Sequence, residues 1–296
     1  YLQIVLLNLL IKTKAMKQEK EELEAIKMPL TYHDIDFLNS DAAREIRILA
    51  EYLYPEHQLA KKKISRTINI YGSARILPLE EWTKKDKELK SKFEDSTGTI
   101  KERLANDIKV HQSKYEFSLV YEECVQLTEM LCQWSMKLPK EKRFYICTGG
   151  GPGIMEAANR GAYNQKSPNI GLNISLPYEQ LPNPYISKDL NFEFYYFFMR
   201  KFWFSSLAEA LIAMPGGFGT FDEIIEQFTL IQTRKVVKKM PVVLYKEDFW
   251  RKSFNFEYLA EIGMIGHEDL FLYEYCSTPD EAFEYITKKL TEYHNL

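Results

Sequence analysis

The sequence predicts an α/β protein: a doubly wound, mostly parallel sheet with helices on both faces, plus an N-terminal helix and a charged helical insertion. Three observations predict this class. From about residue 143 onward, short apolar strands alternate with helical segments. Two glycine-rich turns each join a strand to a helix. The composition, 45% hydrophobic and 27% charged over 296 residues, is that of a globular protein with a substantial core.

The elements before the alternating pattern differ in character. Residues 40–54 carry apolar side chains at helical spacing, and a Ser/Asp start with Pro55 just beyond gives the usual boundary signals. Residues 67–75, "TINIYGSAR", predict a short buried strand running into a glycine turn. The charged stretch at about 80–115 is predicted to be a solvated helical hairpin inserted outside the sheet. Residues 121–138 predict a helix with a wide apolar face.

The alternating pattern then runs to the end of the chain. Two segments predict strand, glycine turn and helix in succession, residues 143–163 and 209–233. Residues 169–177 and 240–246 predict further strands, and residues 197–208 a helix. The closing helix, 278–290, is capped by Thr278 or Asp280. In such sheets ligands bind at the carboxyl ends of the strands, where both glycine turns would lie.

The net charge, the cysteines and the histidines give no indication of a nucleic-acid partner, a membrane partner, disulfide bonds or a metal site. A net charge of −3 gives no reason to expect nucleic acid or an anionic membrane. The four cysteines form no Cys-x-x-Cys pair, which favours reduced thiols in a cytoplasmic protein. No histidine lies near a second histidine or a cysteine at metal-ligand spacing, so no metal site is expected.

The N-terminal run "YLQIVLLNLLIKTKA" is too short to span a bilayer and lacks the flanking features of a signal peptide. We interpret residues 1–30 as an extension that is not native or is disordered, with Met16 or Met28 as the true start. Residues 31–296 are expected to form a single domain that includes the insertion.

The two glycine turns, "TGGGPG" and "PGGFGT", have the properties of phosphate-binding loops. Without Cβ atoms their backbone N–H groups can approach an anion, and the dipole of the following helix adds positive potential. Pro152 suits the first turn of the helix that follows. Tight turns also need glycine, so each turn alone could be purely structural. The candidate phosphate ligands are Thr148, Gly149, Gly150, Gly151 and Gly153 in the first turn, and Pro215, Gly216, Gly217, Gly219 and Thr220 in the second.

The two glycine turns lack the motifs of the common nucleotide-binding loops, and this excludes some classes of phosphate ligand. No Gly-Lys-Ser/Thr follows, which excludes a nucleoside-triphosphate P-loop. Glu156 stands where the dinucleotide fingerprint needs its third glycine. A smaller phosphate ester is the simplest ligand, with Glu156 among the candidate substrate-binding residues.

Six segments, in this order, resemble the LOG family of cytokinin riboside 5′-monophosphate phosphoribohydrolases: "GSAR", "TGGGPGIMEAANRGA", "IGLNISLP", "LPNPYI", "FFMRK" and "PGGFGTFDE". The sequence is similar to the bacterial relatives and the nucleotide 5′-monophosphate nucleosidases from about Thr67 to Leu290, apart from the insertion. It departs from them in the longer region between "GSAR" and "TGGG" and in Glu156, where plant-like members have glycine.

The resemblance implies a Rossmann-like fold, a homodimer or larger homo-oligomer, and no cofactor. It implies hydrolysis of a nucleoside 5′-monophosphate, AMP or a related compound, to free base and ribose 5-phosphate. Some relatives carry the label "lysine decarboxylase", for which the sequence offers no convincing pyridoxal Schiff-base site. The alternative from another class is a non-catalytic nucleotide-binding or carrier protein that uses the same loops.

The resemblance also implies catalytic roles for Arg200 and Glu223. From spacing alone, Thr220 and Glu223 could instead form a capping box, with Asp222 as a first-turn acid. Arg200 and Lys201 could extend to solvent from an aromatic core segment, or pair with a carboxylate or a substrate oxygen. Lys201 is a candidate substrate-binding residue. Ser73 and Arg75 are two more, because they follow the first strand at its carboxyl end.

Overall fold

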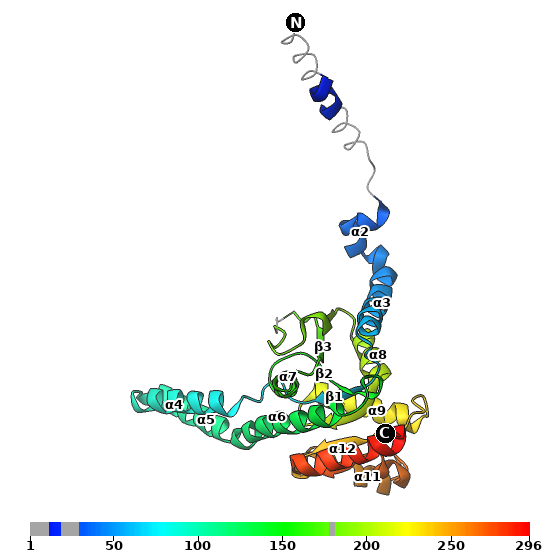
Figure 1. Cartoon of the computed structure of the whole chain (residues 1–296). Helices are drawn as coiled ribbons and strands as arrows, with labels where there is room; N and C mark the ends of the chain where they lie inside the picture. Colours follow the sequence, from blue (N-terminus) through cyan, green and yellow to red (C-terminus); the bar gives the residue numbers. More distant parts are fainter. Residues whose placement is uncertain (1–11, 19–29, 178–180) are drawn as a thin grey trace. The chain divides into compact units, whose positions relative to one another are not determined.

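The computed structural model describes residues 12–18, 30–177 and 181–296 (Figure 1). The chain divides into two units, one up to Glu51 and one from Tyr52, and each is described by itself. In the first, residues 12–18 are helical, and most of the segment predicted to be an extension lies outside the described residues. Its other elements are η1 (Thr31–His33), α2 (Ile35–Asn39), η2 (Asp41–Ala43) and the start of α3 (Arg44–Lys62).

The second unit is built on a seven-stranded sheet in which every neighbouring pair is parallel. The strand order is β4-β3-β2-β1-β5-β6-β7, so the winding direction reverses between β1 and β5. The predicted doubly wound, Rossmann-like fold is therefore confirmed, and the reversal marks where a ligand crevice is expected. The strands are β1 (Thr67–Tyr71), β2 (Tyr145–Thr148), β3 (Asn169–Ile174), β4 (Asn191–Phe194), β5 (Ala208–Ala213), β6 (Val242–Tyr245) and β7 (Glu274–Cys276).

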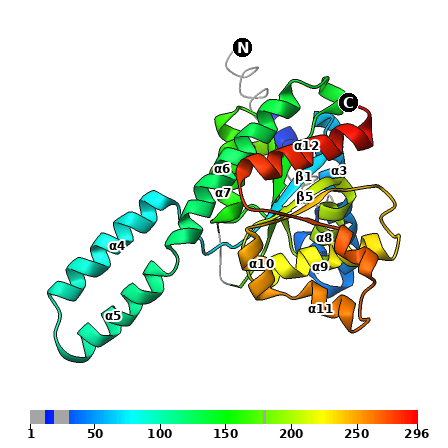
Figure 2. The ribbon, with the colours of Figure 1, turned by 90° about the horizontal axis from the view of Figure 1, so that it is seen from below.

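Helices cover both faces of the sheet. Ile68 and Ile70 of β1 belong to the core that α6, α7 and α12 form on one face. The residues that alternate with them on β1 point to the other face, where Asn69 donates to the Phe204 carbonyl of α8 at 2.9 Å. Figure 2 shows α6, α7 and α12 packed side by side. The helices are α4 (Leu79–Glu94), α5 (Gly98–Gln112), α6 (Tyr115–Met136), α7 (Ile154–Asn164), α8 (Phe197–Leu207), α9 (Phe218–Gln232), α10 (Glu247–Ser253), α11 (Phe256–Glu261) and α12 (Pro279–His294), with η3 (Lys140–Lys142), η4 (Lys188–Leu190) and η5 (His267–Phe271) between them.

Helix α3 does not end before Pro55 as the sequence pattern predicted. It continues through Pro55 to Lys62. Proline removes one backbone hydrogen bond from a helix interior. Pro55 and Leu59 are both buried, so apolar burial offsets that loss and the helix is not terminated.

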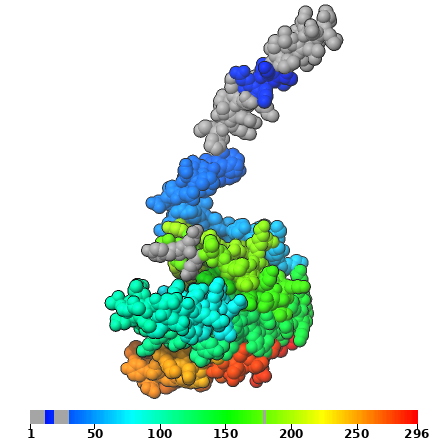
Figure 3. Space-filling model, turned by 90° about the vertical axis from the view of Figure 1, so that its left-hand side faces the viewer, coloured from blue at the N-terminus to red at the C-terminus, as the bar shows by residue number. Residues whose placement is uncertain are grey.

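The predicted charged insertion is a helical hairpin of α4 and α5, and the chain then runs directly into α6. This last helix begins at Tyr115, earlier than predicted. In Figures 1 and 2 the tip of the hairpin projects beyond the sheet, while its base lies beside the start of α6. Figure 3 shows the cyan and teal atoms of the insertion on the face toward the viewer.

At the other end of the chain, Thr278 caps α12, accepting from the Glu281 backbone N–H at 3.3 Å. The four cysteines are buried thiols, and burial raises the pKa of Cys124 and Cys132 to about 12. Within residues 12–18, 30–177 and 181–296, no helix combines the length and apolar character needed to cross a membrane.

Candidate active site

Three loops interlock at the carboxyl ends of β1, β2 and β5. The Ser73 backbone N–H, after β1, donates to the Pro215 carbonyl after β5 at 3.0 Å. The Ser73 carbonyl in turn accepts from the Ile154 N–H at the start of α7, at 3.1 Å. These backbone bonds place both glycine turns and the "GSAR" segment around one point, at the reversal of strand order.

The glycines of the two turns differ in what they do. Gly150 and Gly153 adopt positive φ angles of 72° and 71°. A Cβ on Gly153 would lie 2.3 Å from the Ser73 carbonyl oxygen, so the close approach of the loops requires glycine there. At Gly217 and Gly219 a Cβ would meet nothing within 4 Å. Packing therefore explains Gly150 and Gly153, whereas Gly217 and Gly219 leave backbone open beside a cavity.

A cavity of about 890 Å³ lies against these loops. Ten of the candidate residues line it: Ser73, Arg75, Gly149, Arg200, Pro215, Gly216, Gly217, Gly219, Thr220 and Glu223. Six do not: Thr148, Gly150, Gly151, Gly153, Glu156 and Lys201. The second glycine turn thus faces the cavity, and most of the first lies behind it.

The first turn lies behind the cavity because its polar groups take part in packing. The Thr148 hydroxyl donates to Asn159 at 2.7 Å and accepts from the Gly150 N–H at 3.0 Å. The Glu156 carboxylate accepts from the Tyr121 hydroxyl at 2.9 Å. Asn183, which the sequence reasoning missed, lies 3.1 Å from the Gly150 and Gly151 carbonyls through its amide nitrogen. The sequence did contain a signal for this residue, because Asn183 is the asparagine of the family-like segment "LPNPYI".

Arg200 of α8 and Glu223 of α9 meet at the wall of the cavity. The Arg200 Nη2 lies 3.3 Å from the Glu223 Oε1, and the two side chains are only 14% and 5% exposed. The guanidinium also lies over the Phe197 and Phe204 rings, at 5.2 and 5.7 Å. Arg200 therefore does not extend to solvent; it pairs with a carboxylate, the other arrangement considered from the sequence.

Lys201 pairs with carboxylates of α9 and is not among the residues that line the cavity. Its Nζ lies 2.6 Å from Asp222, 3.0 Å from Glu226 and 3.9 Å from the Glu223 Oε2. The Lys201 ammonium group is therefore paired with carboxylates of α9. These ion pairs join α8 to α9.

The capping-box interpretation of Thr220 and Glu223 is wrong. Helix α9 begins at Phe218 with Gly217 as its N-cap, and no side chain caps it. Thr220 is the third residue of the helix, and Asp222 lies beyond the first turn, where it cannot complement the helix dipole as predicted. Pro152 likewise precedes the N-cap of α7, Gly153. In both turns glycine takes the cap position, but only Gly153, with its positive φ, needs to be glycine for its backbone conformation.

Burial sets the protonation of the site. Desolvation raises the pKa of Glu223 to about 7, although Arg200 and Lys201 act in the opposite direction. Burial also raises the pKa of Tyr71, a cavity residue that the sequence reasoning missed, and the nearby Glu223 charge adds to this effect. The Tyr71 oxygen accepts from the Asn69 amide at 3.1 Å, so its own hydrogen is left for another acceptor. Near neutral pH the site thus combines a titrating carboxyl with a protonated phenol.

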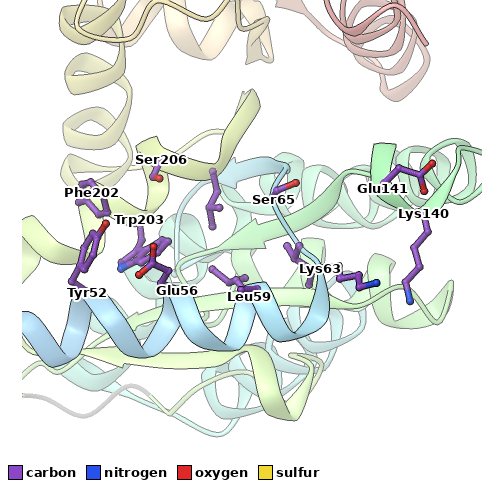
Figure 4. A pocket seen from close by; sticks show the side chains of 13 residues that line it. Tyr52, Glu56, Leu59, Lys63, Ser65, Lys140, Glu141, Phe202, Trp203 and Ser206 are labelled. Carbon is purple, nitrogen blue, oxygen red and sulfur yellow. The ribbon is translucent and has the colours of Figure 1, made fainter.

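A second cavity, of about 660 Å³, lies near the amino ends of β1, β2 and β5 (Figure 4). Tyr52, Phe202 and Trp203 form an aromatic cluster at one end of it, with Tyr52 5.4 and 5.9 Å from the other two ring centres. Its four charged lining residues are two lysines and two glutamates: Lys63, Lys140, Glu56 and Glu141. None of the candidate residues lines it.

Comparisons with known proteins bear on the family and the fold. Residues 155–286 match the family model described as "Possible lysine decarboxylase", a stretch that includes Arg200 and Glu223. No curated protein gives a significant match. Among solved structures, the structural genomics target TM1055 is 18% identical with a TM-score of 0.42, covering 75% of this chain and 99% of that one.

Two further solved structures are similar at the same level. A molybdenum cofactor binding protein from Rippkaea orientalis is 21% identical with a TM-score of 0.40, covering 57% of this chain and 88% of that one. The molybdenum cofactor carrier protein of Chlamydomonas reinhardtii is 17% identical with a TM-score of 0.38 and the same coverage. Similarity this low says nothing about the ligand here, and the family is indicated by the sequence match alone: residues 155–286, within the seven-stranded α/β unit, match the LOG-family model.

Proposed function

We propose that this protein hydrolyses the N-glycosidic bond of a purine-type nucleoside 5′-monophosphate, AMP or a related compound, to give free base and ribose 5-phosphate. The observation that carries the proposal is the buried Arg200–Glu223 pair at the wall of a cavity that the second glycine turn also lines. The match of residues 155–286 to the LOG-family model is consistent with this reaction.

The phosphate would bind at the N-terminus of α9. Gly217 and Gly219 have open space where side chains would be, and both line the cavity. The first backbone N–H groups of a helix have no partner within it, and the helix dipole favours an anion there. Ser73 and Arg75 line the same cavity and would complete the phosphate site.

Glu223 would act on the ribose. Cleavage of an N-glycosidic bond passes through an oxocarbenium-like transition state, which a nearby carboxylate stabilises. With a pKa raised to about 7, Glu223 can also take a proton from the attacking water. The water oxygen bonds to the anomeric carbon, the glycosidic bond breaks, and the proton passes to the departing base. Arg200 would hold the carboxylate in position and favour its ionised form.

The alternative, a non-catalytic nucleotide carrier, requires the loops and the cavity but gives no role to the buried pair. Keeping a carboxylate nearly out of water costs free energy even when it is paired. A binding protein has no evident reason to bear that cost beside its ligand, and so the hydrolase is favoured.

The direct test is to incubate the purified protein with AMP and follow adenine and ribose 5-phosphate by chromatography. We expect both products in equal amounts. Glu226→Gln is a matched control, because Glu226 lies one turn further along α9, pairs with Lys201 and does not line the cavity. Binding of AMP without release of adenine would favour the carrier instead.

We also infer from the family resemblance that the protein is a homodimer or a larger homo-oligomer. The side chains of Phe197, Phe198 and Phe202 on α8 are 50%, 50% and 43% exposed, and a partner subunit could cover them. Sedimentation velocity would show a species above 34.9 kDa, and a single species at that mass would contradict the inference.

A further inference from the structure

The helical insertion contributes to the lining of the cavity, and the proposed reaction gives these residues no role. Trp82 and Lys85 of α4, His111 of α5 and Lys114 just after α5 all line the cavity that Arg200 and the second glycine turn also line. The hairpin predicted to be merely solvated is thus part of the site wall.

Trp82 and His111 fix the base of the hairpin. Their rings stack with centres 4.7 Å apart and planes 9° apart. The Trp82 Nε1 donates to the His111 carbonyl at 3.0 Å, and the His111 Nε2 lies 3.0 Å from the Trp82 carbonyl. Since a carbonyl only accepts, the His111 Nε2 carries the hydrogen of that bond. This reciprocal pair holds α4 and α5 in one relative position beside the cavity.

Each ring residue is followed three positions later by a lysine. Lys85 follows Trp82, and Lys114 follows His111. Residues three apart are neighbours on a helix surface. The chain keeps a helical turn up to Lys114, because its N–H donates to the His111 carbonyl at 3.0 Å. The stacked rings therefore determine where both lysine side chains start, and both reach the cavity.

The cavity carries more positive charge than one phosphate group needs. Among the residues that the structure describes, the charged groups of Arg75, Lys85 and Lys114 make no ion pair and no hydrogen bond; the bonds that join Arg75 and Lys114 to neighbouring serine hydroxyls involve their backbone atoms. The carboxylate that lines the cavity, Glu223, is already paired with Arg200. All three side chains are exposed to solvent, and cations that line one cavity favour an anionic ligand there. The second glycine turn, at the N-terminus of α9, adds further positive potential to the same cavity.

We propose that Lys85 and Lys114 bind a second anionic group, while Arg75 contacts the first phosphate, so that the preferred substrate is a nucleoside 5′-monophosphate carrying a further phosphate or carboxylate. This inference rests on the proposed function for the identity of the nucleotide. The second group could sit on the ribose, on the phosphate chain or on the base, and three probes separate these positions: adenosine 3′,5′-bisphosphate, ADP and adenylosuccinate.

The test compares dissociation constants by calorimetry in a Glu223→Gln background, so that turnover does not interfere. Each probe is measured against AMP with three proteins: the background, the background with Lys85→Ala and Lys114→Ala, and the background with Lys84→Ala and Lys87→Ala. The last pair is a matched control, since both lysines are exposed on α4 and neither lines the cavity.

We expect at least one probe to bind the background and the control at least tenfold more tightly than AMP. The Lys85/Lys114 variant should reduce that advantage to less than threefold. The inference is overturned if no probe binds more tightly than AMP, or if the Lys85/Lys114 variant weakens AMP and the probes by the same factor. Hydrolysis by the wild-type protein is measured separately: no base released from any nucleotide, with the binding preference intact, would contradict the proposed reaction but support the second anion site.

Discussion

The Arg200 Nη2 lies 3.3 Å from the Glu223 Oε1, and this contact joins the helix before β5 to the helix after it. The pair therefore exists only when β5 is in place, beside β1 at the reversal of strand order. Neither helix alone could bury such a pair, because a buried charge needs its partner and a surrounding core. The geometry of the fold, rather than either motif, brings the two residues together.

Replacing Arg200 should reduce turnover without abolishing the fold. We expect Arg200→Ala to lower kcat/KM for AMP at least about 100-fold, on the order of 2.7 kcal/mol. Arg200→Lys keeps the positive charge but not the planar guanidinium, and we expect a loss of at least about tenfold. Activity is measured on protein whose circular dichroism matches wild type.

Arg251→Ala is the control for this series, because Arg251 also pairs with glutamates but lies about half exposed and outside the cavity. Its kcat/KM should stay within about threefold of wild type. If Arg200→Ala also stays within about threefold, a ΔΔG‡ below roughly 0.7 kcal/mol, Arg200 has no catalytic role.

Activity should depend on pH through Glu223. Burial raises its pKa to about 7, and the ionised form is the one that stabilises an oxocarbenium ion. We expect kcat/KM to rise with pH below about 7 and to level off above it. A profile that is flat from pH 5.5 to 8.5 would show that Glu223 does not titrate in the free enzyme or is not needed as the anion.

Stability should change with pH in the opposite direction. A carboxyl whose folded pKa exceeds its unfolded value, here about 7 against 4.5, binds more protons in the folded state. Its contribution to stability is fully present below pH 4.5 and is lost as pH rises through 7. The unfolding free energy of wild type minus that of Glu223→Gln should therefore fall between these pH values, measured by urea titration. A difference that increases over this range contradicts the assignment.

Two glycine-to-alanine variants should distinguish a glycine needed for packing, Gly153, from one proposed to leave room for the ligand, Gly219. Gly153→Ala places a Cβ 2.3 Å from the Ser73 carbonyl at a positive φ, so it should lower the unfolding free energy by about 1–3 kcal/mol. Gly219→Ala has open space in the first turn of α9 and should change stability by less than about 1 kcal/mol.

Gly219→Ala should nevertheless raise the KM for AMP, because its methyl group enters the space proposed for the phosphate. Steady-state kinetics and urea titrations on both variants provide the comparison. If Gly219→Ala has the KM of wild type, the phosphate does not bind at the N-terminus of α9 as proposed.

The sheet and the glycine turns could be predicted from sequence because their signals are local. A run such as "TINIY" is apolar throughout, and a glycine turn ends the strand in the next few residues. Strands β4 and β7 escaped prediction because, at the two edges of the sheet, they are only partly buried and lack the continuous apolar run of the inner strands. Helix α3 was predicted to end too early because the cost of Pro55 is local, while the burial that offsets it depends on the folded core.

The site was only partly predictable because its decisive features are long-range. Spacing placed Thr220 and Glu223 in a capping box, and nothing local shows that Gly217 caps α9 instead. Arg200 and Glu223 were singled out together by the family resemblance. The roles of Tyr71 and Asn183, and the arrival of the insertion at the cavity, depend on packing between segments far apart in sequence.

The most direct test of the whole account is the kcat/KM of Glu223→Gln for AMP, measured against wild type at pH 8 by release of adenine. Glutamine keeps the shape of the carboxyl but cannot carry its negative charge. At pH 4.5, where the carboxyl is protonated in the folded protein and about half protonated in the unfolded chain, the two proteins should differ in unfolding free energy by less than about 1 kcal/mol. The account predicts a loss of at least about 100-fold, on the order of 2.7 kcal/mol of transition-state stabilisation. A folded Gln variant that releases adenine at a near-native rate would contradict it.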